Sequence, residues 1–177
     1  MVEGESEEVY FNRIARLSNR YSIIPKISKD KRCDDIVINC MKMAKRLGLE
    51  GDDIKVAVFD LDVVKGPELE RAITLADEND VILMPSNLSF EVWLLMHLED
   101  VSKVYTQEDY EERLSRHLNE RYRKSRGLRD NVNIDSVNKS IKRGERSLPD
   151  ADPKKCLESP NTSTLWRLLS DILNGPA

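Results

Sequence analysis

Two short apolar stretches decide the fold: KVAVFD at residues 55–60 and VILM at residues 81–84. Both are continuous, and each is too short for a helix, so we interpret them as buried strands. Strands that are apolar on both faces are typical of a parallel sheet covered by helices. Gly66-Pro67 opens an intervening helix that runs to Asn79. This strand–helix–strand order predicts an α/β protein with a parallel sheet.

Outward from these strands, apolar residues recur at helical spacing. Up to about residue 98 helices and strands alternate, whereas the remainder is helical and more highly charged. We therefore expect an α/β core over residues 1–100 and a helical extension over residues 101–177, packed on that core. The expected elements are helices at 6–21, 34–47, 68–79, 90–98, 106–124, 134–148 and from 162 onward, a short strand at 22–27 and a polar loop at 149–160.

The composition excludes a membrane-spanning protein. Hydrophobic residues make up 40% of the chain and charged residues 34%, and no apolar run approaches the roughly 18 residues that span a bilayer. The acidic start MVEGESEE does not resemble a signal peptide. We therefore expect a soluble cytoplasmic protein. Without a CxxC pair the three cysteines are expected to be packing residues, and both histidines are expected to be structural or on the surface.

Acidic side chains gather where the strands end. Asp60 and Asp62 follow the first strand, Glu91 lies in SNLSFE after the second, and EGESEE occupies residues 3–8. Each run could be only a polar strand end or a set of first-turn helix acids. Two carboxylates on one side of an extended segment, however, repel each other unless a cation lies between them. Oxygen ligands favour Mg²⁺ or Mn²⁺. Gly4 could allow a sharp turn or a close approach to the backbone.

A basic segment adds a second signal. Residues 113–146 hold eleven Lys or Arg against four acids, a net charge of +7, within a chain of net charge −4. Charge of this kind suits contact with nucleic-acid phosphates, although a solvated helix surface explains it equally well.

Several motifs together resemble one family. EGESEEVYF at residues 3–11, VFDLD at 58–62, SNLSFEVWLLMHL at 86–98, YRK at 122–124 and PNTST at 160–164 are similar to motifs of the RloB-like proteins. These proteins have a Toprim-type fold related to that of the OLD-family nucleases. The stretch at 86–98 is the most specific, although Leu88 replaces the family's proline. Only Met1 and Val2 precede Glu3, where that fold has its first strand.

The resemblance implies a Toprim-like parallel sheet flanked by helices and a metal-dependent nuclease in antiviral defence. It would cleave DNA or RNA, tRNA included, with Mg²⁺ or Mn²⁺, and a partner protein of a defence system could assist it. The roles carried over are metal ligands Glu3, Glu7, Asp60 and Asp62; catalytic residues Glu3, Glu91 and Lys124; and substrate-binding residues Ser86, Asn87 and Arg123.

Two other functions fit the same residues. The chain could be a non-catalytic Toprim-like module that binds nucleic acid or a nucleotide. It could also be a subunit of a defence complex that contacts its partner through the helix around Trp166, although an apolar stripe there more often packs in a core.

Overall fold

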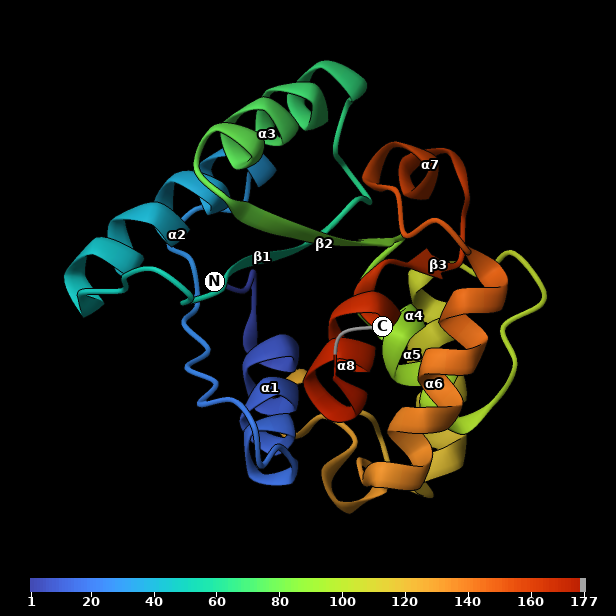
Figure 1. The fold of residues 1–177 in the computed structure, drawn as a ribbon. Coiled ribbons are helices and arrows are strands. Elements are labelled where there is room, and N and C mark those ends of the chain that lie inside the picture. Colours follow the sequence, from blue (N-terminus) through green and yellow to red (C-terminus); the bar gives the residue numbers. More distant parts are fainter. Residues whose placement is uncertain (176–177) are drawn as a thin grey trace.

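The sheet is small and mixed. The structure, a computed structural model, describes residues 1–175, and within them strands β1 (Lys55–Asp60) and β2 (Val81–Asn87) pair in parallel. Strand β3 (Thr162–Ser163) is antiparallel to the end of β2. Beyond β1, Val2 forms isolated parallel bridges with Val58 and Ile27. The α/β class is confirmed, but the purely parallel sheet is not, because β3 runs in the opposite direction (Figure 1).

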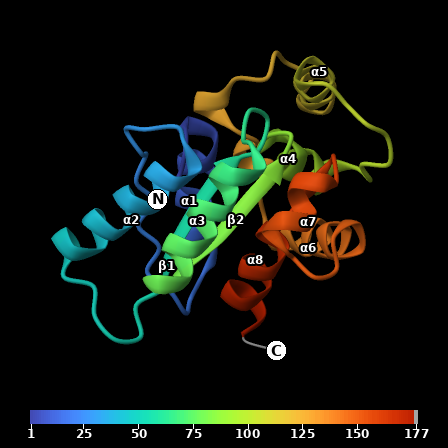
Figure 2. The same ribbon diagram turned by 90° about the horizontal axis from the view of Figure 1, so that it is seen from above.

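Helices cover both faces of this sheet. Helices α2 and α3 lie on one face and α1 and α8 on the other, with α6 packed against α8 and α4 against α6 (Figures 1 and 2). Within residues 1–175 the helices are α1 (Glu5–Leu17), α2 (Cys33–Leu47), α3 (Gly66–Glu78), α4 (Glu91–Leu98), α5 (Gln107–Leu118), α6 (Ile134–Ser147), α7 (Pro153–Glu158) and α8 (Leu165–Asn174), with 3₁₀ turns at Lys124–Arg126 and Arg129–Asn131.

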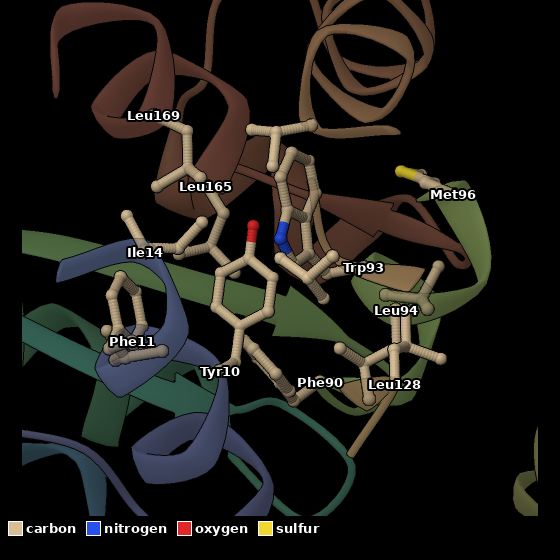
Figure 3. Packing of buried hydrophobic residues seen from close by; sticks show 14 of the residues in the cluster. Tyr10, Phe11, Ile14, Phe90, Trp93, Leu94, Met96, Leu128, Leu165 and Leu169 are labelled. Atoms are coloured by element: carbon tan, nitrogen blue, oxygen red, sulfur yellow. The ribbon is translucent and has the colours of Figure 1, made fainter. Parts of the chain in front are cut away.

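Each face of the sheet contributes to its own hydrophobic core, because successive strand residues point to opposite sides. Ala57 and Phe59 pack against α2 and α3, whereas Val58 joins the larger core on the other face. Figure 3 shows that larger core around Trp93. It draws on α1, α4, α5, α6 and α8, so residues from both halves of the chain share it. The division into two domains at residue 100 stays a prediction.

The helix boundaries follow local signals in the sequence. Gly48 ends α2 with a left-handed φ of 66°, and Thr106 caps α5 in a capping box. Helix α5 nevertheless ends at Leu118, because Asn119 adopts a left-handed φ of 54°. The prediction of a helix to residue 124 was therefore wrong.

Three further expectations need correction. The predicted loop at 149–160 contains α7, whose first turn is capped by the Asp152 carboxylate. The helix predicted from residue 162 onward begins only at Leu165, and Thr162 lies in β3. In the predicted strand at 22–27, only Ile27 forms a β-bridge.

The cysteines and His97 are structural, as expected. All three cysteines are free and buried. His97 is buried, with ring nitrogens 3.2 Å from the hydroxyls of Tyr10 and Ser136. No helix within residues 1–175 is long and apolar enough to cross a bilayer.

Candidate carboxylate–lysine site

The candidate site forms where four segments meet at the carboxyl end of β1. Asp60 is the last residue of β1, and Glu91 is the first residue of α4. Glu7 lies in the first turn of α1, and Lys124 begins a 3₁₀ turn after α5. Groups at the carboxyl ends of parallel strands share one edge of a sheet, which explains how the strand arrangement brings these groups together.

Hydrogen bonds to backbone amides fix two of the carboxylates. Glu3 Oε2 accepts from the Asp60 N–H at 2.8 Å. Asp60 Oδ1 in turn accepts from the Phe90 N–H at 2.7 Å. The Lys31 ammonium donates to the Glu3 carbonyl oxygen. These contacts tie the N-terminal segment, the end of β1 and the start of α4 together.

Glu91 is held as an ionised carboxylate. Its side chain is 1% exposed, and its Oε1 accepts from the hydroxyls of Tyr122 at 3.0 Å and Ser6 at 3.3 Å. Gln107 donates to Oε2 at 3.2 Å, and Lys124 Nζ lies 3.6 Å from Oε1. Burial favours the neutral acid, but the Lys124 charge and hydrogen bonds from Ser89, Gln107 and Tyr122 outweigh it and lower the pKa of Glu91.

Glu7 and Asp60 are pushed toward protonation. Burial, with repulsion from Glu3 and Glu91, raises the pKa of Glu7 to about 7. Burial and the charges of Glu7, Glu3 and Glu91 raise the pKa of Asp60 well above its ordinary range. Burial also raises the pKa of Glu3. The site therefore holds more negative charge than its surroundings compensate.

Lys124 faces this excess charge. Burial disfavours its ammonium form, but attraction from Glu91, Asp60 and Glu7 outweighs burial and raises its pKa. Its side chain is 52% exposed, so the cation is also accessible from solvent. Lys124 therefore stays charged, with its side chain between the carboxylates and the solvent.

The remaining predicted site residues make other contacts or are exposed. Asp62 is exposed in a bend after β1, although its charge still acts on Glu3. Ser86 and Asn87 lie inside β2 and contact the C-terminal segment: Ser86 Oγ is 2.9 Å from Ser163 Oγ, and the Asn87 amide donates to the Cys156 carbonyl at 2.8 Å. Arg123 is exposed before the 3₁₀ turn. Substrate binding by these residues remains a prediction.

Gly4 lies in a bend of the chain between the Val2 bridge and α1, where a turn was expected. Its backbone is nevertheless extended, with φ −150°, so it does not need glycine's conformational freedom. A Cβ at Gly4 would lie 3.4 Å from a Glu7 carboxylate oxygen, which is an ordinary van der Waals contact. Neither backbone conformation nor space therefore requires glycine at this position.

The carboxylate oxygens of the site are the type of ligand that a hard divalent cation prefers. Within residues 1–175, no three His, Cys, Asp or Glu side chains are arranged as a ready-made metal cage. Glu3, Glu7 and Asp60 nevertheless offer only oxygen atoms, which suit Mg²⁺ or Mn²⁺. After burial, repulsion from neighbouring carboxylates contributes to their raised pKa values: from Asp62 for Glu3, and from Glu3 and Glu91 for Glu7 and Asp60. A bound cation would relieve this repulsion.

Sequence analysis missed three residues that support Glu91. Tyr122 stands in the YRK motif, of which only Arg123 and Lys124 were predicted as site residues, and Ser6 stands between the acids of EGESEE. Burial and the Glu91 charge raise the pKa of Tyr122, so its hydroxyl remains a donor. Gln107 belongs to no motif and reaches Glu91 because α5 packs beside α4.

The fold and site define an α/β protein with clustered carboxylates and a lysine at one end of a parallel strand pair. The chain belongs to the RloB-like protein family, whose family model matches residues 1–172. This confirms the resemblance noted in the sequence. The comparisons found no matching curated protein and no matching solved structure.

Proposed function

We propose that this protein is a Toprim-like, divalent-metal-dependent nuclease that cleaves phosphodiester bonds of DNA or RNA in antiviral defence. The observation that carries the proposal is the cluster of Glu3, Glu7 and Asp60, in which Glu7 is buried and the other two are partly buried. Burial and the charges of neighbouring carboxylates raise the pKa values of all three. Such strongly perturbed carboxylates are concentrated at functional sites.

The site residues would have three roles: metal binding, stabilisation of negative charge on the phosphate, and positioning of the lysine. Glu3, Glu7 and Asp60 would hold the cation, with Asp62 joining from the exposed bend. A bound Mg²⁺ or Mn²⁺ would polarise a phosphate and lower the pKa of a water molecule. Lys124 would stabilise negative charge on a phosphate oxygen, because its ammonium is both accessible and held charged. Glu91 would position Lys124 through their ion pair.

Cleavage assays test the activity directly. The full chain would be incubated with tRNA, single-stranded DNA and duplex DNA, each with Mg²⁺, Mn²⁺ or a chelator. We expect metal-dependent cleavage that Asp60→Asn lowers at least about 100-fold, in line with the loss of a group that acts in the transition state. Asparagine retains an oxygen that can accept from the Phe90 N–H, so the fold should persist.

The matched control is Asp52→Asn, which removes an exposed carboxylate in the segment before β1 and should leave cleavage unchanged. Equal cleavage by the wild type, Asp60→Asn and Glu3→Gln would reject the mechanism. Calorimetric metal binding without turnover of any substrate would instead favour the binding-module function.

The defence role needs a cellular test. Cells that express the chain should support fewer phage plaques than cells that express Asp60→Asn at the same level. Equal plaque numbers for the two, despite cleavage in vitro, would separate the activity from defence.

A further inference from the structure

Strand β2 has a free backbone edge on the side away from β1. The Ser86 carbonyl accepts from the Leu61 N–H at 3.0 Å, whereas the Pro85 carbonyl faces the other way and accepts from the Thr164 N–H at 3.1 Å. Backbone N–H and C=O groups point to alternate sides along a strand. Those of Val81 and Leu83 therefore point to the same side as the Pro85 carbonyl, away from β1. Among residues 1–175, β3 pairs with this edge only at Ser86 and Asn87 (Figure 1).

A groove runs along this free edge. It has a volume of about 500 Å³, and Val81, Ile82, Leu83 and Met84 all line it. Helices α3 and α8 and the segment 150–154, which leads into α7, supply the other lining residues. An unpaired strand edge is a template for another extended chain, and this groove provides space beside it.

The charges around the groove favour a basic occupant. Four aspartates line it, namely Asp77, Asp150, Asp152 and Asp171. The lining cations are Arg167 and Lys154. Lys154 is paired with Glu70 at 2.8 Å, and among the aspartates Asp150 is paired with Lys155 and Asp152 caps α7. The groove is therefore net acidic, and complementary charge would select a peptide that carries lysine or arginine.

We propose that an extended, lysine- or arginine-rich peptide segment of a partner protein binds in this groove as an added strand beside β2. Backbone groups of Val81 and Leu83 pair with the peptide, and the aspartates contact its cationic side chains. A second copy of this chain is a poor occupant, because much of its basic segment at 113–146 is already folded into α5 and α6.

The first probe is a fluorescent seven-residue peptide of alternating lysine and valine, titrated into the full chain and followed by fluorescence polarisation. A peptide with glutamate in place of lysine tests charge. A lysine peptide with alternate N-methylated amides keeps the charge but cannot pair along one edge. We expect measurable binding of the first peptide and at least tenfold weaker binding of the other two.

Hydrogen exchange and two variants locate the binding. The lysine peptide should slow amide exchange in residues 81–84, and Asp171→Lys should weaken binding at least tenfold. Asp52→Lys, which makes the same charge change outside this groove, should not. Equal affinity for the N-methylated peptide, unchanged exchange at 81–84, or no binding tighter than about 1 mM would overturn the proposal.

Discussion

At the scale of single residues, Asp60 represents a conflict between stability and function. It is surrounded by the charges of Glu3, Glu7 and Glu91, all of which raise its pKa. Catalytic groups often carry such a stability cost. We therefore expect Asp60→Asn to raise the melting temperature of the metal-free protein while it removes cleavage. The measurement is thermal unfolding in chelator at pH 8, and a lower melting temperature than that of the wild type would contradict this expectation.

Glu7 and His97 give opposite pH dependences. The pKa of Glu7 is raised from 4.5 to about 7, so its contribution to stability is present below pH 4.5 and is lost as pH rises through 7. The pKa of His97 is lowered by burial from 6.5 to about 3, so its contribution is present above pH 6.5 and is lost as pH falls toward 3. Between pH 4.5 and 6.5 the two trends oppose each other.

Single variants should separate these trends. Each group whose proton uptake differs between the folded and unfolded states changes stability by up to about 1.4 kcal/mol per pH unit. In chelator, acidification from pH 6.5 to 4.5 should destabilise Glu7→Gln more than the wild type and destabilise His97→Gln less. Urea unfolding measures both, and parallel pH profiles for all three proteins would show that neither group titrates in this way.

At the scale of elements, α6 and α8 meet at Gly144. A Cβ added there would lie 2.8 Å from the Trp166 Cβ. Alanine is favoured over glycine in a helix by about 1 kcal/mol, but overpacking a core usually costs about 1–3 kcal/mol. Gly144→Ala should therefore lower the free energy of unfolding despite the better helix former.

Gly66→Ala is the matched control. A Cβ at this helical position would meet nothing within 4 Å, so this substitution should be neutral or stabilising. Urea unfolding of both variants makes the comparison. If Gly144→Ala were as stable as Gly66→Ala, the close α6–α8 contact would not constrain the fold.

The sequence predicted elements that carry a strong local signal. Strands β1 and β2 are continuous apolar runs, and most helices show apolar spacing with recognisable ends. Strand β3 has only two residues and no periodicity, and its partners Ser86 and Asn87 are distant in sequence. Helix α7 is short and begins at a cap and a proline in a segment that resembles a loop. Such elements depend on tertiary contacts more than on local pattern.

Some residues of the candidate site could also be predicted from the sequence, whereas others could not. Asp60 and Glu91 were predicted to meet because they follow parallel strands, and Glu7 and Lys124 lie near them as the family motifs implied. Asp62 was expected on the same side as Asp60, but the strand ends at Asp60 and the alternation of side chains ends with it. Gln107 could not be predicted, because only the packing of α5 against α4 brings it to Glu91.

At the scale of the whole molecule, the basic segment at 113–146 is not a bare cationic surface. Among the side chains of this segment that the structure describes, five arginines form ion pairs with acids, some of them outside the segment: Arg113–Glu99, Arg116–Glu112, Arg126–Glu120, Arg143–Asp100 and Arg146–Asp100. Helices α5 and α6 are thereby linked to the end of α4. The net charge of +7 therefore overstates the charge available to nucleic acid.

Divalent cations should stabilise the whole fold, because the carboxylates of the site tie three segments together. A ligand at 100 times its dissociation constant stabilises a protein by about 2.7 kcal/mol. Saturating Mg²⁺ or Mn²⁺ should raise the melting temperature of the wild type, and the rise should be largely absent in Asp60→Asn. Scanning calorimetry with and without metal measures this, and equal rises in both proteins would place the bound cation elsewhere.

The pairing of β3 with β2 has a consequence for protein synthesis. Glu3, Asp60 and Glu91 leave the ribosome early, but the edge of β2 beside them is completed by Thr162 and Ser163. Leu165 and Leu169 of α8 then complete the core around Trp93. Until residues 162–169 have been synthesised, a nascent chain therefore lacks part of the core that surrounds α4, the helix that begins at Glu91. Any activity that depends on the position of Glu91 would then begin only after α8 has been made.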